Sequence, residues 1–122
     1  MSKTVIVMGT GAQGGTIAMR LNEEPNVEKI ICADYDLNAA RRYENMLDKA
    51  VAVQVDARNL KEIVDASKGA DLIVNGLPPD FNPAVMEAAL TNGMHYQDMA
   101  SGPVADIDFV GAVKRQLALD EQ

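Results

Sequence analysis

The chain begins with a short apolar run that leads into three glycines at fixed spacing, and this corner dictates the fold around it. Residues 5–8 read Val-Ile-Val-Met, and Gly9, Gly11 and Gly14 follow as G-x-G-x-x-G before an amphipathic stretch. In such a strand–turn–helix corner the first glycine allows the tight turn and the second lets the backbone approach a pyrophosphate. The third lets the helix sit close to the strand. The pattern therefore predicts the start of a dinucleotide-binding domain.

An acidic residue completes the pattern at the end of the second apolar run. Asp34 comes about twenty residues after Gly14, where a carboxylate can accept hydrogen bonds from both hydroxyl groups of an adenosine ribose. The same carboxylate would repel the 2′-phosphate of NADP, and proteins that select NADP usually place an arginine nearby. Here Tyr35 and Asp36 follow instead, and Asp36 is predicted to cap the next helix. We expect NAD as the cofactor, in preference to NADP.

Apolar runs and helical patterns alternate along the rest of the chain. The runs are nearly continuous in apolar character, as in strands that are buried on both faces. Strands that alternate with helices form parallel neighbours through right-handed crossovers. We therefore predict an α/β fold of the Rossmann type, a doubly wound parallel sheet of about five strands in the order 3-2-1-4-5 with helices on both faces. The predicted strands are 4–8, 29–33, 51–55, 71–75 and 94–99, and the predicted helices are 12–23, 37–48, one after Asn59 and one that Asn82 caps and that ends at Leu90.

Two further loops are expected at the carboxyl edge of this sheet, where ligands of such folds bind. Asp56 and Ala57 follow the third strand, and an adenine would lie against Ala57. Asp56 is either an acceptor for the adenine amino group or a turn residue, and both interpretations stay open. Gly76, Leu77 and Pro78 follow the fourth strand, and backbone groups there are expected to contact the nicotinamide ribose, although a stiff turn alone would explain the prolines.

Length, charge and composition exclude several classes of protein. The 122 residues fit one domain, and a net charge of −7 disfavours nucleic acid as a partner. Cys32 is the only cysteine, so no disulfide can form within the chain, and it is interpreted as a small buried apolar residue. No apolar stretch reaches the roughly 20 residues of a membrane span. We expect a soluble cytoplasmic protein that binds neither nucleic acid nor membrane.

Few residues outside these loops carry recognisable chemistry. His95 is the only histidine, and no cysteine or second histidine accompanies it, so we expect no metal site. Asp98 ends the fifth strand at the functional edge. It is a weak candidate for the boundary of a substrate pocket, and helix capping or solvation explains it equally well.

Taken in order, these motifs resemble the N-terminal domain of the saccharopine dehydrogenase family over about the whole chain. Members of that family make or break a carbon–nitrogen bond on an amino acid by hydride transfer between an imine and a nicotinamide. They include saccharopine dehydrogenases and reductases of lysine metabolism, lysine 6-dehydrogenase and carboxynorspermidine dehydrogenase. The motifs are Gly9-Thr-Gly11-Ala-Gln-Gly14, Ala33-Asp34-Tyr35-Asp36, Val55-Asp56-Ala57-Arg58, Gly76-Leu77-Pro78-Pro79 and His95-Tyr96-Gln97-Asp98-Met99-Ala100.

The resemblance implies that residues 1–122 are the cofactor domain of a longer, homo-oligomeric enzyme whose substrate domain is missing. Such a fragment is expected to be inactive alone. Asp120 would match an acid near the amino-acid substrate, which makes it a second weak catalytic candidate. An alternative class is the nucleotide-sensing regulatory module of potassium channels and transporters, which has a similar fold and performs no chemistry. The residues predicted to bind the cofactor are Gly9, Gly11, Ala12, Gln13, Gly14, Asp34, Tyr35, Asp56, Ala57, Gly76, Leu77 and Pro78.

Overall fold

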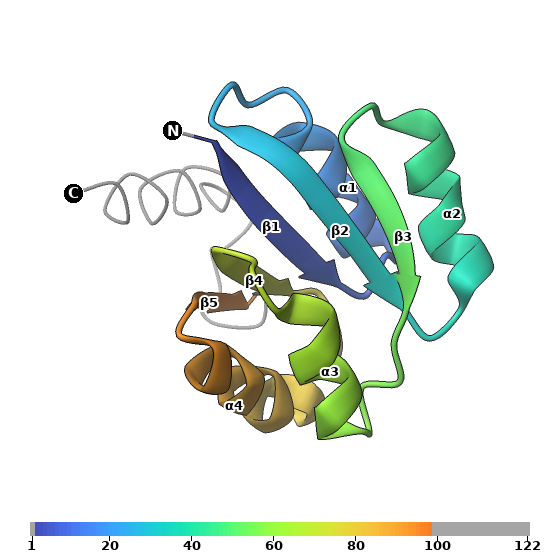
Figure 1. Ribbon diagram of the computed structural model, residues 1–122. Coiled ribbons are helices and arrows are strands. Elements are labelled where there is room, and N and C mark those ends of the chain that lie inside the picture. The colour runs from blue at the N-terminus through green and yellow to red at the C-terminus, as the bar shows by residue number, and fades with distance from the viewer. Residues whose placement is uncertain (1, 99–122) are drawn as a thin grey trace.

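The structure is a computed structural model that describes residues 2–98 (Figure 1). Its centre is a parallel sheet of five strands in the order β3-β2-β1-β4-β5, as predicted. The order reverses between β1 and β4, which makes the carboxyl edge there the ligand crevice of such sheets. The elements are β1 (Lys3–Met8), α1 (Ala12–Leu21), β2 (Val27–Asp34), α2 (Leu37–Met46), β3 (Ala50–Gln54), α3 (Leu60–Ser67), β4 (Leu72–Asn75), the 3₁₀ helix η1 (Pro79–Phe81), α4 (Asn82–Asn92) and β5 (His95–Asp98).

Helices cover both faces of the sheet, so its central strands have no polar face. On β1, Val5 and Val7 pack into the cluster that contains the side chains of α1, whereas Ile6 and Met8 pack into the cluster of α3 and α4. This alternation follows from the period of two along a strand, and it explains the nearly continuous apolar runs of the sequence. Figure 1 shows α1 and α2 together at one face and α3 and α4 together at the other.

The predicted elements are confirmed with small shifts of their ends, except that Met99 of the last predicted strand lies outside the described residues. One start was wrong: Asn82 is the first residue of α4 rather than its cap, and Phe81 of the preceding 3₁₀ helix takes the cap position. The side chain of Asn82 instead accepts a hydrogen bond from Asn75 at 2.7 Å. The caps expected for the two preceding helices are present, with Asp36 on α2 and Asn59 on α3.

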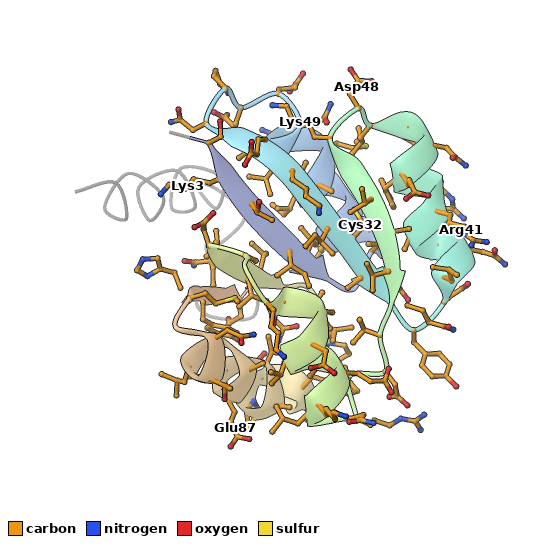
Figure 2. The ribbon with its side chains drawn as sticks, in the orientation of Figure 1. Lys3, Cys32, Arg41, Asp48, Lys49 and Glu87 are labelled. Carbon is orange, nitrogen blue, oxygen red and sulfur yellow. The ribbon has the colours of Figure 1, made fainter. Side chains whose placement is uncertain are left out.

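Cys32 lies in the middle of β2 and is fully buried (Figure 2). Burial, followed by the nearby Glu44 carboxylate, raises the pKa of its thiol to about 11. A buried thiol that stays protonated has little reactivity. This agrees with the interpretation of Cys32 as a small apolar core residue.

Candidate functional site: a pocket at the glycine turn

The glycine turn joins β1 to α1 by a close approach of backbone atoms. Gly9 has φ of +85°, a left-handed conformation that favours glycine. A Cβ on Gly14 would overlap the carbonyl oxygen of Gly9, so only glycine lets α1 approach the turn this closely. Gly11 is the N-cap of α1, where no side chain caps the helix and the first turn holds no acidic residue. Because the first N–H groups of a helix have no acceptor within it, this end can receive an anion.

Asp34 ends β2 beside this turn, and its carboxylate is held by three hydrogen bonds. Its Oδ2 accepts from the backbone N–H of Thr10 at 2.8 Å and from the Thr10 hydroxyl at 2.7 Å. Its Oδ1 accepts from the backbone N–H of Asp36 at 2.9 Å. A carboxylate has about four acceptor positions. Oδ1 therefore keeps one position that a ribose hydroxyl could use.

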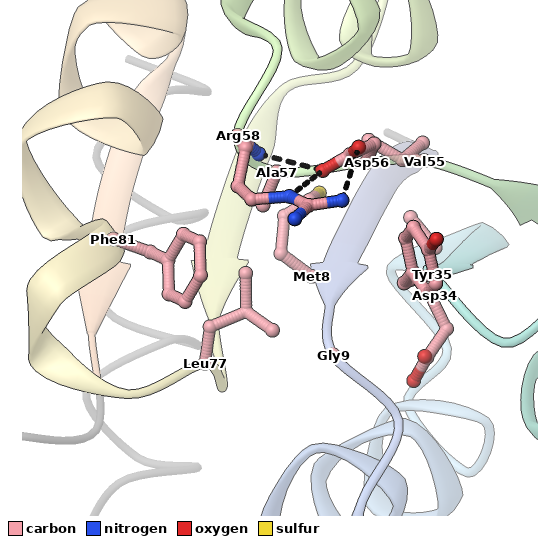
Figure 3. A pocket seen from close by; sticks show the side chains of 11 residues that line it. Met8, Gly9, Asp34, Tyr35, Val55, Asp56, Ala57, Arg58, Leu77 and Phe81 are labelled. Atoms are coloured by element: carbon pink, nitrogen blue, oxygen red, sulfur yellow. Dashed lines mark hydrogen bonds and ion pairs between the residues drawn. The ribbon is translucent and has the colours of Figure 1, made fainter.

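A pocket of about 340 Å³ opens next to Asp34 (Figure 3). Its size falls within the roughly 300–1,000 Å³ of ligand pockets in general. Figure 3 shows Leu77 and Phe81 at one side and the ring of Tyr35 at the other. The pocket is lined by the ends of β1 and β2 and by the loops after β2, β3 and β4, namely by Met8, Gly9, Ala33, Asp34, Tyr35, Val55, Asp56, Ala57, Arg58, Leu77 and Phe81.

An ion pair in the loop after β3 forms part of the pocket wall. Asp56 accepts two side-chain hydrogen bonds from Arg58, from Nε to Oδ1 and from Nη2 to Oδ2, each at 3.0 Å. These bonds hold the pKa of Asp56 below its usual range. The guanidinium carbon of Arg58 lies 5.5 Å from the ring centroid of Tyr35, a cation–π distance. Oδ1 of Asp56 also accepts from the Arg58 backbone N–H at 3.0 Å, so Asp56 does serve as a turn residue, while its contact with adenine stays a prediction.

The loop after β4 is organised by the buried side chain of Asn75. Its Oδ1 accepts from the backbone N–H of Leu77 at 3.0 Å, and its Nδ2 donates to Asn82 Oδ1 at 2.7 Å. The N–H of Gly76 donates to the Met8 carbonyl at 2.8 Å. The N–H groups of Gly76 and Leu77 are thus already used within the protein. The predicted contacts with the nicotinamide ribose would have to come from their carbonyl oxygens or from the Leu77 side chain.

The two weak catalytic candidates lie apart from this pocket or outside the described residues. Asp98 pairs in register with Asn75 at the edge of β5 and does not line the pocket. Burial and, to a smaller extent, the Asp98 carboxylate raise the pKa of the neighbouring Tyr96 to about 12. The described structure gives Asp98 this influence on Tyr96 and no contact with the pocket. Asp120 lies outside residues 2–98.

Neither a cluster of metal-binding side chains nor a membrane-spanning helix occurs in residues 2–98. Within residues 2–98, no group of three or more His, Cys, Asp or Glu side chains could hold a metal ion. The half-buried His95 of β5 belongs to no such group. Among the helices of the same residues, none is both long and apolar enough to span a membrane.

The fold brings the predicted cofactor residues to one edge of the sheet in three groups. Six of them line the pocket, and the others lie at the start of α1 or in the loop after β4. Sequence reasoning missed Thr10, Arg58 and Phe81, because their roles depend on contacts between loops. The pocket-lining group is Gly9, Asp34, Tyr35, Asp56, Ala57 and Leu77, the α1 group is Gly11, Ala12, Gln13 and Gly14, and the β4 group is Gly76 and Pro78.

Comparison with known proteins gives the same fold and one sequence family. The family model described as the saccharopine dehydrogenase NADP binding domain matches residues 5–120. Apo saccharopine dehydrogenase (L-Glu forming) from Saccharomyces cerevisiae is similar with a TM-score of 0.74 at 17% identity, over 83% of this chain and 22% of that one. Triphenylmethane reductase from Citrobacter sp. is similar with a TM-score of 0.68 at 18% identity, over 79% of this chain and 36% of that one. Uronate dehydrogenase from Agrobacterium tumefaciens is similar with a TM-score of 0.57 at 22% identity, over 75% and 38% of the two chains.

Proposed function

Because this chain belongs to the saccharopine dehydrogenase family through its NADP-binding domain, we propose that it is the cofactor-binding part of an oxidoreductase that prefers NAD. The observation that carries the proposal is the convergence of three features on one edge of the sheet. These are the uncapped start of α1, the fixed carboxylate of Asp34 and the adjoining pocket of about 340 Å³. Each matches one part of the cofactor: the pyrophosphate, the adenosine ribose and the adenine.

The glycine turn supplies the space that a pyrophosphate needs. A Cβ placed on Gly11 would have no atom within 4 Å, so this position faces open space. Phosphate oxygens there would accept from the free N–H groups at the start of α1, and the positive end of the helix dipole would favour them. The nicotinamide would then lie toward the loop after β4, at the point where the strand order reverses. When bound, the nicotinamide supplies hydride transfer.

The proposed preference for NAD rests on the fixed position of the Asp34 carboxylate. Three hydrogen bonds from Thr10 and Asp36 hold its carboxylate in place. It cannot turn away without losing them, and a 2′-phosphate at this corner would meet a fixed negative charge. The description of the family names NADP, so the proposed preference depends on these residues of this chain alone.

Titration calorimetry of the chain with NAD and with NADP tests both parts of the proposal. We expect NAD to bind more tightly, and Asp34→Ser combined with Tyr35→Arg to reverse the order because it exchanges a fixed anion for a cation. Asp48→Asn is the control for the loss of a carboxylate alone, since it removes one negative charge from an exposed residue before β3 (Figure 2). Equal or tighter binding of NADP by the unaltered chain would contradict the preference, and binding of neither would contradict the function.

We propose further that the enzyme acts on a CH–NH bond of an amino acid. The support is the family relationship, because the family is named after saccharopine dehydrogenase, an enzyme that acts on an amino acid. The substrate would be held by residues outside the described part of the chain, because the described pocket is accounted for by adenosine.

The homo-oligomeric state and the cytoplasmic location stay predictions. A nucleotide-sensing module is the competing class, and the family relationship favours the oxidoreductase.

A further inference from the structure

The adenosine pocket contains a positive charge close to the ribose corner, although no arginine stands next to Asp34 in the sequence. Arg58 carries the only positive charge among the described residues that line the pocket. It comes from the loop after β3, and its guanidinium lies over the ring of Tyr35, the residue that follows Asp34. Figure 3 shows this side chain extending across the top of the pocket toward Asp56 and Tyr35. Arg58 therefore approaches the corner at which NAD and NADP differ.

In the structure the Arg58 guanidinium is paired with the Asp56 carboxylate. Both oxygens of Asp56 accept from the Arg58 side chain, in the fork geometry that guanidinium groups also offer to phosphate. The pair is open to solvent, since the side chain of Arg58 is 70% exposed and that of Asp56 is 28% exposed. Exposed ion pairs are usually weak, but a bidentate arginine–carboxylate pair is a stronger kind, so Asp56 competes with a ligand for this guanidinium. Among the described residues that line the pocket, Asp56 alone accepts two hydrogen bonds from the Arg58 side chain.

We propose that Asp56 is a specificity-determining residue, which keeps Arg58 paired with itself and thereby away from the 2′ position of the adenosine ribose. Asp34 repels a 2′-phosphate. Arg58 could compensate for this repulsion, but its pairing with Asp56 makes it less available to the phosphate. Without Asp56, the guanidinium could turn toward the ribose and form a bidentate contact with the phosphate of NADP. This inference rests on the proposed function, because it concerns selection between two forms of the same cofactor.

The ratio of the affinities for NAD and NADP isolates this effect. Any contact between Asp56 and the adenine is shared by the two cofactors, so its loss weakens both equally and leaves the ratio unchanged. We expect Asp56→Asn to shift the ratio toward NADP by about tenfold, the size of one added charge-assisted contact. The double variant Asp56→Asn with Arg58→Gln should return the ratio to that of the unaltered chain.

Charge-matched controls separate the pocket from the overall charge. Asp48→Asn removes an exposed carboxylate far from the pocket, and Asp56→Asn with Arg41→Gln removes an exposed arginine of α2 in place of Arg58 (Figure 2). The first should leave the ratio unchanged and the second should keep the shift. Circular dichroism and thermal unfolding of each variant confirm that the domain is folded.

Calorimetry with both cofactors therefore has distinct outcomes. A shift toward NADP in Asp56→Asn that Arg58→Gln cancels supports the inference. An unmoved ratio in folded Asp56→Asn, or a shift that survives the loss of Arg58, overturns it and leaves the proposed function intact. Binding of neither cofactor to the unaltered chain overturns the proposed function, and the inference with it.

Discussion

A single threonine between the motif glycines determines how Asp34 is presented to a ligand. Thr10 is buried, with 3% of its surface exposed, and it donates both its backbone N–H and its hydroxyl to Asp34 Oδ2. Two donors on one oxygen orient the carboxylate before any ligand arrives. A preorganised acceptor loses less side-chain entropy on binding than a free one. The glycine turn therefore has two functions, since it forms the phosphate end of the site and also fixes the ribose acid.

At Gly11 the structure predicts that binding and folding can be separated. Gly11→Val should abolish binding of NAD, because the branched side chain would occupy the space in which the pyrophosphate is expected. The backbone there is extended, with φ of −73°, and no atom lies within 4 Å of an added Cβ, so the first side-chain atom meets no clash. The loss of a glycine N-cap should cost at most about 1 kcal/mol of stability. Calorimetry measures the binding, and circular dichroism and urea unfolding measure the fold.

Gly14→Val is the matched comparison for this prediction. Its Cβ would overlap the Gly9 carbonyl oxygen, so this variant should lose stability as well as binding. Undiminished affinity in Gly11→Val would mean that the pyrophosphate binds elsewhere on the chain.

Among the elements, the end of β4 determines the shape of the crevice. Asn75 is the last residue of this strand and is 1% exposed. It joins three segments, because it accepts from Leu77 in the following loop, donates to Asn82 at the start of α4 and lies 3.5 Å from the Tyr96 hydroxyl on β5. The loop that is expected to lie beside the nicotinamide is therefore fixed by one buried amide.

We expect Asn75→Ala to destabilise the domain by about 2 kcal/mol, because it leaves polar partners in a buried place without their hydrogen bonds. Urea unfolding followed by circular dichroism measures the loss. Asn38→Ala, an exposed amide on α2, is the control and should change stability by less than about 0.5 kcal/mol. An Asn75→Ala variant as stable as the control would show that the loop is held by its prolines and backbone alone.

The strands and helices could be predicted from the sequence, because each of them carries a local pattern. The apolar runs, the glycine spacing and the caps at Asp36 and Asn59 involve residues close together in the chain. The contacts within the site could not be read in this way. The pairing of Thr10 with Asp34 spans 24 residues, and the approach of Arg58 to Tyr35 depends on how two loops meet above the sheet. The start of α4 was missed for a related reason, since Asn82 binds Asn75 instead of capping its helix.

At the scale of the whole molecule, the proposed cofactor residues lie along one edge of the sheet. The carboxyl edge of the sheet carries the glycine turn, the pocket beside Asp34 and the loop after β4, which are the three parts of the proposed cofactor site. Asp98, at the end of β5, stands apart from that pocket. The chain also spans 22% of the yeast saccharopine dehydrogenase to which it is similar. The proposed amino-acid substrate has no assigned contact among the described residues.

The last prediction is that the 122-residue chain binds NAD but turns over no amino-acid substrate. Hydride transfer requires the second reactant at about 3–3.5 Å from the nicotinamide, in a site from which water is excluded. The described residues provide the proposed cofactor contacts, and none of them is assigned to a second reactant. NADH absorbance during incubation of the chain with NAD and saccharopine, lysine or a carboxylated polyamine measures turnover, and calorimetry on the same sample confirms that NAD is bound. Sustained formation of NADH would show that the chain holds a complete active site, and Gly11→Val would then test whether the turnover depends on the glycine turn.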